Sequence, residues 1–199
     1  GALQAQDGNQ KTLNVYFDLG PQAFRDADIL NHVSAKLVHE VKRLRLALGD
    51  EVRIASIGGS YAERLSAPDF NRSFKFTFRG ADPRDLPRGM AEQIALLPQQ
   101  KVQSSQGGLQ ALIGEIETDC EAGPVHTIIV MNGTDSLTLN GNDAEYVDLP
   151  QVRLCGTFTF VGWWTFEHPE AWPGMRKQVE AFTKDLMIGM GASDVDFIR

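Results

Sequence analysis

Hydrophobic residues near the start of the chain follow two different periods. Leu13–Leu19 is an apolar run rich in β-forming residues, which is typical of a strand buried on both faces. Hydrophobic residues then recur at three- and four-residue steps, a spacing that predicts an amphipathic helix. The helix stripe consists of Ile29, Leu30, Val33, Leu37, Val41, Leu44 and Leu48. Gly49 follows in the position expected of a glycine that ends a helix.

Strand-like and helix-like segments alternate along the rest of the chain. Strands are expected at Glu51–Gly58, Arg72–Gly80, His126–Asn132, Val152–Gly162 and Asp194–Ile198. Helices are expected at Leu86–Leu97 and Gly107–Asp119, and within 172–192, where Met175, Val179, Phe182 and Leu186 form a stripe. The polar stretch 134–148 has little regular pattern and is expected to be a long loop.

This order of elements predicts an α/β fold with a mainly parallel central sheet. Helices on both faces of such a sheet give a three-layer αβα architecture, which is Rossmann-like in general arrangement. Arg72–Gly80 alternates phenylalanines with polar residues, which favours one half-buried antiparallel strand at the sheet edge. We expect a single domain over 12–199, preceded by a disordered lead-in at 1–11.

Composition narrows the classes of partner. The chain has 199 residues and a formal net charge of -7, which argues against nucleic acid as a partner, because nucleic-acid binding needs basic patches. Its longest apolar runs are the size of strands, so no transmembrane segment is expected.

The two cysteines and the first residues bear on localisation. Cys120 and Cys155 are either two buried thiols or one disulfide, and the compartment decides between these. The start, GALQAQDGNQ, resembles residues just after a signal-peptidase site. We therefore expect a secreted or periplasmic protein whose signal peptide has been removed.

Oxygen-bearing side chains follow several of the predicted strands. Asp18 ends the first strand, Ser104 and Ser105 precede a predicted helix, and Asn132 ends the strand beginning at His126. Ligands of parallel sheets bind beyond the carboxyl ends of the strands, and hard cations such as Mg²⁺ prefer oxygen ligands. These four residues are candidate metal ligands.

The pattern of a strand ending in Asp18, an amphipathic helix, the stretch SSQGGLQALIGEIE and the strand TIIVMNG resembles a von Willebrand factor A-type domain. The family binds a cation through Asp-x-Ser-x-Ser, a later threonine and a later aspartate. Here Gly20 and Gln22 replace the two serines, Ser104 or Ser105 replaces the threonine, and Asn132 replaces the second acid. The resemblance implies a protein-interaction module with a degenerate metal-ion-dependent adhesion site. No cofactor is expected apart from weak Mg²⁺ or Ca²⁺ binding.

The expected partner is another protein, of unknown identity. Candidate contact residues are Asp18, Gln22, Asp135, Trp163, Trp164 and Trp172. Other interpretations stay open for several of these residues. Asp18 is equally suited to accepting loop amides, the two serines are suited to capping a helix, and the tryptophans are suited to covering the edge of the core.

Two alternative functions remain. Ser60 follows two glycines after a strand, as in part of a nucleophile elbow, and His168 would be its base in a serine-hydrolase-type enzyme. The third class is a structural subunit of an envelope assembly for secretion or conjugation. An enzyme is a less favoured hypothesis than the interaction module, since nothing in the sequence fixes the geometry of Ser60 and His168.

Overall fold

The computed structural model describes residues 10–18, 27–47, 49–57, 74–77, 113, 116, 118–133, 137–140, 143–146, 149–165 and 175–199. For 54–57, 74–77, 137–140 and 143–146 the description is limited to the backbone. The predicted helix Leu86–Leu97 lies outside the described residues, and Gly107–Asp119 lies mostly outside them.

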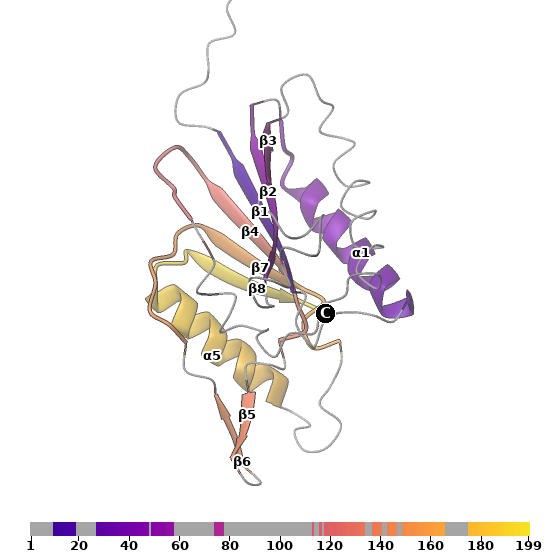
Figure 1. The fold of residues 1–199 in the computed structure, drawn as a ribbon, viewed down its shortest axis with the longest axis vertical. Helices are drawn as coiled ribbons and strands as arrows, with labels where there is room; N and C mark the ends of the chain where they lie inside the picture. Colours follow the sequence, from indigo (N-terminus) through magenta and orange to yellow (C-terminus); the bar gives the residue numbers. More distant parts are fainter. Residues whose placement is uncertain are drawn as a thin grey trace, which may run out of the picture.

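A six-stranded sheet forms the centre of the described structure, in the order β3-β2-β1-β4-β7-β8 (Figure 1). Five of its strands run parallel: β1 (Thr12–Asp18), β2 (Glu51–Ile57), β4 (Val125–Val130), β7 (Thr157–Val161) and β8 (Asp194–Ile198). At one edge, β3 (Phe74–Thr77) pairs antiparallel with β2.

Helices α1 (Ala27–Arg43) and α5 (Met175–Gly189) pack against opposite faces of the sheet (Figure 1). Leu13, Val15 and Phe17 share one hydrophobic cluster with the buried side chains of α1. Tyr16, Phe158 and Phe160 share the other cluster with Val179 and Met187 of α5. The two clusters follow from the period of two in a strand, which sends alternate side chains to opposite faces. The predicted α/β character of the chain is therefore confirmed.

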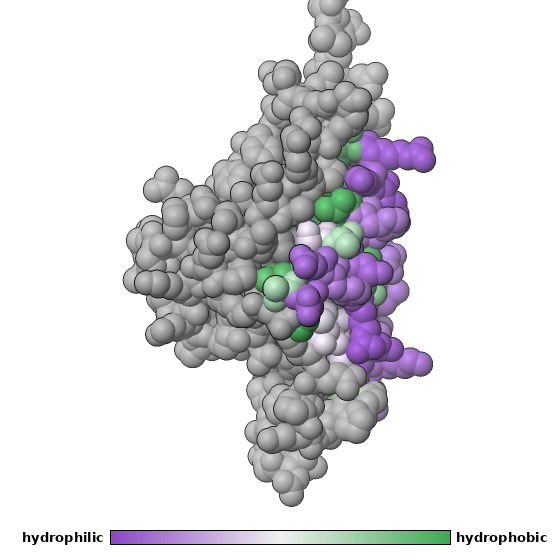
Figure 2. Space-filling model, turned by 90° about the vertical axis from the view of Figure 1, so that its right-hand side faces the viewer, coloured by the Kyte–Doolittle hydropathy of each residue, from purple (hydrophilic) through white to green (hydrophobic). Residues whose placement is uncertain are grey.

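The outer side of α1 is polar. The helix buries Leu30, Val33, Leu37 and Val41, which belong to the predicted stripe. Figure 2 shows the molecule from the α1 side. Hydrophilic residues form a strip along one edge, and a few hydrophobic residues are visible between this strip and the rest of the molecule. No helix in the described part of the chain is both long and apolar enough to cross a membrane.

The predicted end of the first helix at Gly49 is wrong, because α1 ends at Arg43. The amide groups of Leu44 and Arg45 donate to carbonyls only three residues earlier, and Arg45 has a φ of 49°. This left-handed conformation stops the α-helix. Lys11 stabilises the end, since its Nζ donates to the carbonyl of Leu44 at 3.0 Å. Leu44 still packs against the core, which explains why the hydrophobic stripe continues past the helix.

The predicted loop 134–148 contains regular structure. Strands β5 (Leu137–Asn140) and β6 (Asp143–Tyr146) pair antiparallel as a separate two-stranded sheet. Only Gly141 and Asn142 lie between the paired residues Asn140 and Asp143, which is the length of a tight hairpin connection. The expectation of an irregular loop was wrong because the short Leu-Thr-Leu alternation and the Gly-Asn pair were overlooked.

The predicted strand Val152–Gly162 is also too long, because β7 starts at Thr157. Gly156 has a φ of 81°, and a Cβ there would lie 2.1 Å from the carbonyl oxygen of Val125. The segment before it is held instead by Leu154, whose amide donates to the carbonyl of Met190 at 2.9 Å. The apolar composition of the residues just before β7 therefore indicates burial, but these residues do not form a strand.

A disulfide joins Cys120 to Cys155, with Cα atoms 6.2 Å apart. It ties the segment before β4 to the segment before β7, and the two cysteines are 35 positions apart in the chain. The amide of Cys155 also donates to Thr118 Oγ1 at 3.0 Å. The sequence left two thiols and one disulfide as alternatives, and the structure has the disulfide.

We expect reduction of this disulfide to lower the free energy of unfolding by about 3–4 kcal/mol, since the bond restricts a loop of this length in the unfolded chain. Urea unfolding with and without dithiothreitol measures the difference. The matched control is the Cys120→Ser/Cys155→Ser protein, whose stability should be low and insensitive to the reductant. Equal stability of the oxidised and reduced wild type would contradict a stabilising bridge.

Candidate functional site

Two predicted site residues lie at the carboxyl edge of the sheet. Asp18 is the last residue of β1, and Asn132 follows β4. The register pairs Phe17 with Val130, so these strands end side by side. Both side chains are buried, with exposed fractions of 2% for Asp18 and 0% for Asn132. The structure therefore brings one candidate carboxylate and one candidate amide to the same edge.

Seven other candidate residues from the sequence lie outside the described part of the chain. They are Gln22, Ser60, Ser104, Ser105, Asp135, His168 and Trp172. Among the residues that are described, no group of three histidine, cysteine, aspartate or glutamate side chains is gathered as a metal site would require. Cation binding at the carboxyl edge stays a prediction.

Backbone hydrogen bonds join three chain segments at this edge. The amide of Trp164 donates to the carbonyl of Asn132 at 2.7 Å, and the amide of Met131 donates to Val161 at 3.2 Å. Trp163 donates to the carbonyl of Ile198 at 2.9 Å. The ends of β4, β7 and β8 are thus held together beyond the sheet itself.

Both predicted contact tryptophans in the described chain are buried. Trp163 is 0% exposed and Trp164 is 2% exposed. The Trp163 ring lies 4.9 Å from the Phe160 ring and 4.7 Å from the Phe197 ring, measured between centroids. These contacts favour the alternative in which the tryptophans cover the edge of the core. Their role in binding a partner stays a prediction.

Trp163 and Gly133 are closely fitted. Gly133 has a φ of 83°, and a Cβ on it would lie 2.1 Å from the Trp163 ring. Trp164 itself has a φ of 55°, which is unusual for a residue with a side chain. Close packing holds this conformation in place, and conformational strain of this kind is common near functional sites.

A second polar region lies on the α1 face, at the amino ends of the strands. Register places His126 beside Thr157, and Thr157 beside Asp194, in one row across β4, β7 and β8. The next row on the same face includes Thr159 and Asp196. These rows line a pocket of about 380 Å³, and the last turn of α1 lines it as well.

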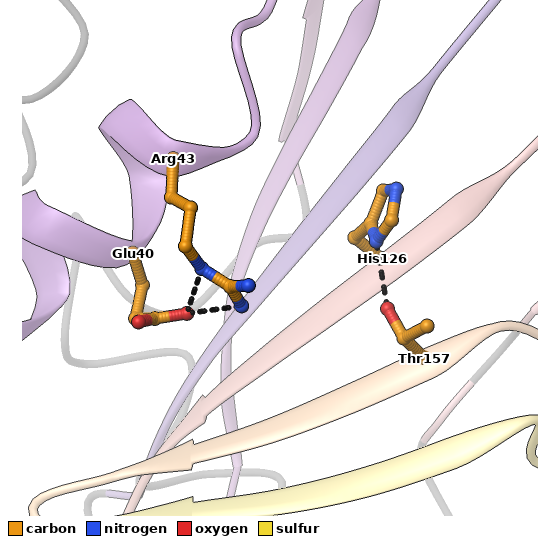
Figure 3. Close-up of polar contacts among 4 residues, drawn as sticks. All are labelled: Glu40, Arg43, His126 and Thr157. Carbon is orange, nitrogen blue, oxygen red and sulfur yellow. Dashed lines mark hydrogen bonds and ion pairs between the residues drawn. The ribbon is translucent and has the colours of Figure 1, made fainter.

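His126 is held at one end of the pocket. Its Nδ1 and the Thr157 Oγ1 lie 2.7 Å apart in a hydrogen bond, and Figure 3 shows Nε2 at the far side of the ring from Thr157. Burial lowers the pKa of His126 below its usual value of 6.5, and the positive charges of Lys11 and Arg43 lower it further. The imidazole is therefore neutral at neutral pH, in a locally positive environment.

Two charged residues of α1 approach the same pocket. Arg43 donates through Nε and Nη2 to Glu40 Oε2, at 3.2 and 2.9 Å (Figure 3). The Glu40 side chain is only 8% exposed, so this ion pair is partly shielded from water. Both hydrogen bonds use one carboxylate oxygen, which fixes the guanidinium beside the pocket.

Sequence reasoning did not identify this pocket. His126, Thr157 and Asp194 are each at or near the start of a separate strand, and their proximity depends on strand order and register. One feature of the sequence could have indicated the pocket: polar residues occupy alternate positions of β7 and β8. They are Thr157, Thr159, Asp194 and Asp196. Such alternation indicates a strand face that is not wholly apolar.

Comparison with known proteins does not assign a family. No protein-family model matches the chain, and no curated protein matches it. The site has to be interpreted from its own residues.

We expect Gly133→Ala to destabilise the protein more than Gly49→Ala. Both glycines have a positive φ, but a Cβ on Gly49 would have nothing within 4 Å. Gly49→Ala should cost about 1–2 kcal/mol through backbone strain alone. Gly133→Ala should cost roughly 1–3 kcal/mol more, because the methyl group meets the Trp163 ring. Urea unfolding of the two variants measures the difference, and equal losses would contradict the close fit.

Proposed function

We propose that the protein is a non-catalytic protein-interaction module with a three-layer, von Willebrand A-like arrangement. In this proposal the carboxyl edge of the sheet faces the partner, and the cation site there is degenerate. The observation that carries the proposal is the placement of Asp18 and Asn132 at adjacent strand ends. An amide stands where the family resemblance expects a second carboxylate.

The residue chemistry at this edge supports weak cation binding at most. A neutral amide contributes an oxygen without a negative charge, and Mg²⁺ or Ca²⁺ binds more tightly as carboxylates are added. Gly20 and Gln22 also stand where hydroxyl ligands are expected. A module that retains the edge but has lost these ligands would bind its partner without depending on a cation.

We further propose that the protein is secreted or periplasmic. The Cys120–Cys155 disulfide supports this, because such bonds persist mainly in oxidising compartments. A structural subunit of an envelope assembly would share this compartment. A soluble interaction module is the favoured proposal, since the composition fits an ordinary globular domain.

The degenerate site is tested by restoring its missing charge. Asn132→Asp would place a second carboxylate near Asp18, and these like charges should repel one another in a buried setting. We expect Mg²⁺, Mn²⁺ or Ca²⁺ to raise the melting temperature of this variant well above its effect on the wild type, because a ligand that binds only the folded state stabilises it. Thermal unfolding with increasing cation measures the effect.

Two further variants make the experiment specific. Asn132→Asp combined with Asp18→Asn should lose the cation response, since one carboxylate is again missing. Asp185→Asn changes an exposed acid of α5 and serves as the control for general charge effects. If Asn132→Asp responds to cations no more than the wild type does, the edge is not a degenerate cation site.

A further inference from the structure

The charged residues that line the pocket beside His126 differ between its two ends. Lys11, Arg43 and His126 lie at the end formed by the start of β1, the last turn of α1 and β4, where two positive charges outnumber the single carboxylate of Glu40, to which Arg43 is bonded. Asp194 and Asp196 line the pocket from β8. Since β7 separates β4 from β8, the two ends are about 9–10 Å apart, which is two strand spacings.

The hydrogen bonds at the first end leave donors for a ligand. Lys11 Nζ bonds Leu44 O at 3.0 Å and Arg45 O at 3.5 Å, so the ammonium is fixed close to the pocket. Arg43 donates hydrogen bonds to Glu40 through Nε and Nη2, so its Nη1 group remains to donate to a ligand. In the tautomer whose Nδ1 accepts from the Thr157 hydroxyl, His126 carries its proton on Nε2, which can then donate to a ligand. Burial is the main cause of the lowered pKa of His126, and the positive charges of Lys11 and Arg43, which lower it further, also favour an anion nearby.

The acidic end is more exposed. Asp194 forms an ion pair with Lys184 at 3.4 Å, and the two side chains are 53% and 44% exposed. An ion pair at such exposure is weak, so a ligand cation can replace Lys184 at little cost. Asp196 lies on the same face of β8, two residues further along the strand, and is also exposed.

We propose that this pocket binds a small zwitterion, with a carboxylate at the His126 end and an ammonium group at the Asp194 and Asp196 end. The volume of about 380 Å³ suits a small molecule. Thr157 and Thr159 provide hydroxyls between the two ends. This binding activity is independent of the proposed partner surface, which lies at the opposite ends of the strands.

Binding is tested with 6-aminohexanoate, an ω-amino acid whose extended length suits the distance between the two ends. The His126 imidazole resonances report one end of the pocket, and the backbone amide resonances of Asp194 and Asp196 report the other. We expect saturable shifts at both ends in the millimolar range. Hexanoate and hexylamine each carry one of the two charges and should bind at least about tenfold more weakly.

Variants test which residues bind each end of the ligand. His126→Gln and the double variant Asp194→Asn/Asp196→Asn should each weaken 6-aminohexanoate binding about tenfold. The double variant changes exposed residues only, so it tests the proposal even if His126→Gln fails to fold. Lys184→Gln should strengthen binding, because it removes the competing cation. Lys36→Gln alters an exposed lysine of α1 and should leave binding unchanged.

The same pair of charges occurs in a free ω-amino acid and in the C-terminal lysine of a peptide. A short peptide ending in lysine and its C-terminal amide therefore distinguish the two sources. Binding of 6-aminohexanoate or of the free-carboxylate peptide supports the proposal. Absence of saturable shifts with both probes overturns it, and so does equal binding of hexanoate, which would reduce the site to one for simple anions.

Discussion

The pairing of β1 on both sides is the constraint on which the rest of the structure depends. β1 pairs in parallel with β2 and with β4, and its residues from Leu13 to Asp18 are all buried. Its alternating side chains enter the two hydrophobic clusters separately. Asn14 is one of the buried polar residues of this strand, and its side-chain amide has no hydrogen-bond partner among the described residues. The hydrophobic contacts on both faces must offset that cost.

The two ends of this sheet differ in chemical character. At the carboxyl edge, backbone hydrogen bonds and tilted contacts between aromatic rings hold Trp163 and Trp164 in the interior, beside Asn132. At the amino side, polar residues of β7 and β8 leave a charged pocket under the end of α1. Parallel sheets commonly bind ligands at the carboxyl edge. In this protein a pocket of about 380 Å³ lies at the opposite, amino side, where Lys11 provides positive charge and His126 provides a ring nitrogen.

The sequence predicted most of the parts that depend on local pattern. The strand of Asp18, the helix containing Leu37 and the strand just before Asn132 follow from apolar periodicity and are present. The predicted end of α1 was wrong because Arg45 adopts a left-handed conformation, which the local sequence pattern does not predict. The pocket escaped prediction because His126 and Asp194 meet only through strand order and register, which tertiary packing decides.

Hydrogen exchange of the backbone amides tests the central position of β1 most directly. Amides of β1 and β4 should exchange slowest of all, and only through global unfolding, because these are the two central strands of the six-stranded sheet. The edge strand β8 should exchange faster through local opening. The denaturant dependence of exchange separates the two routes. Exchange of the Val15 and Phe17 amides as fast as that of the β8 amides would contradict the account.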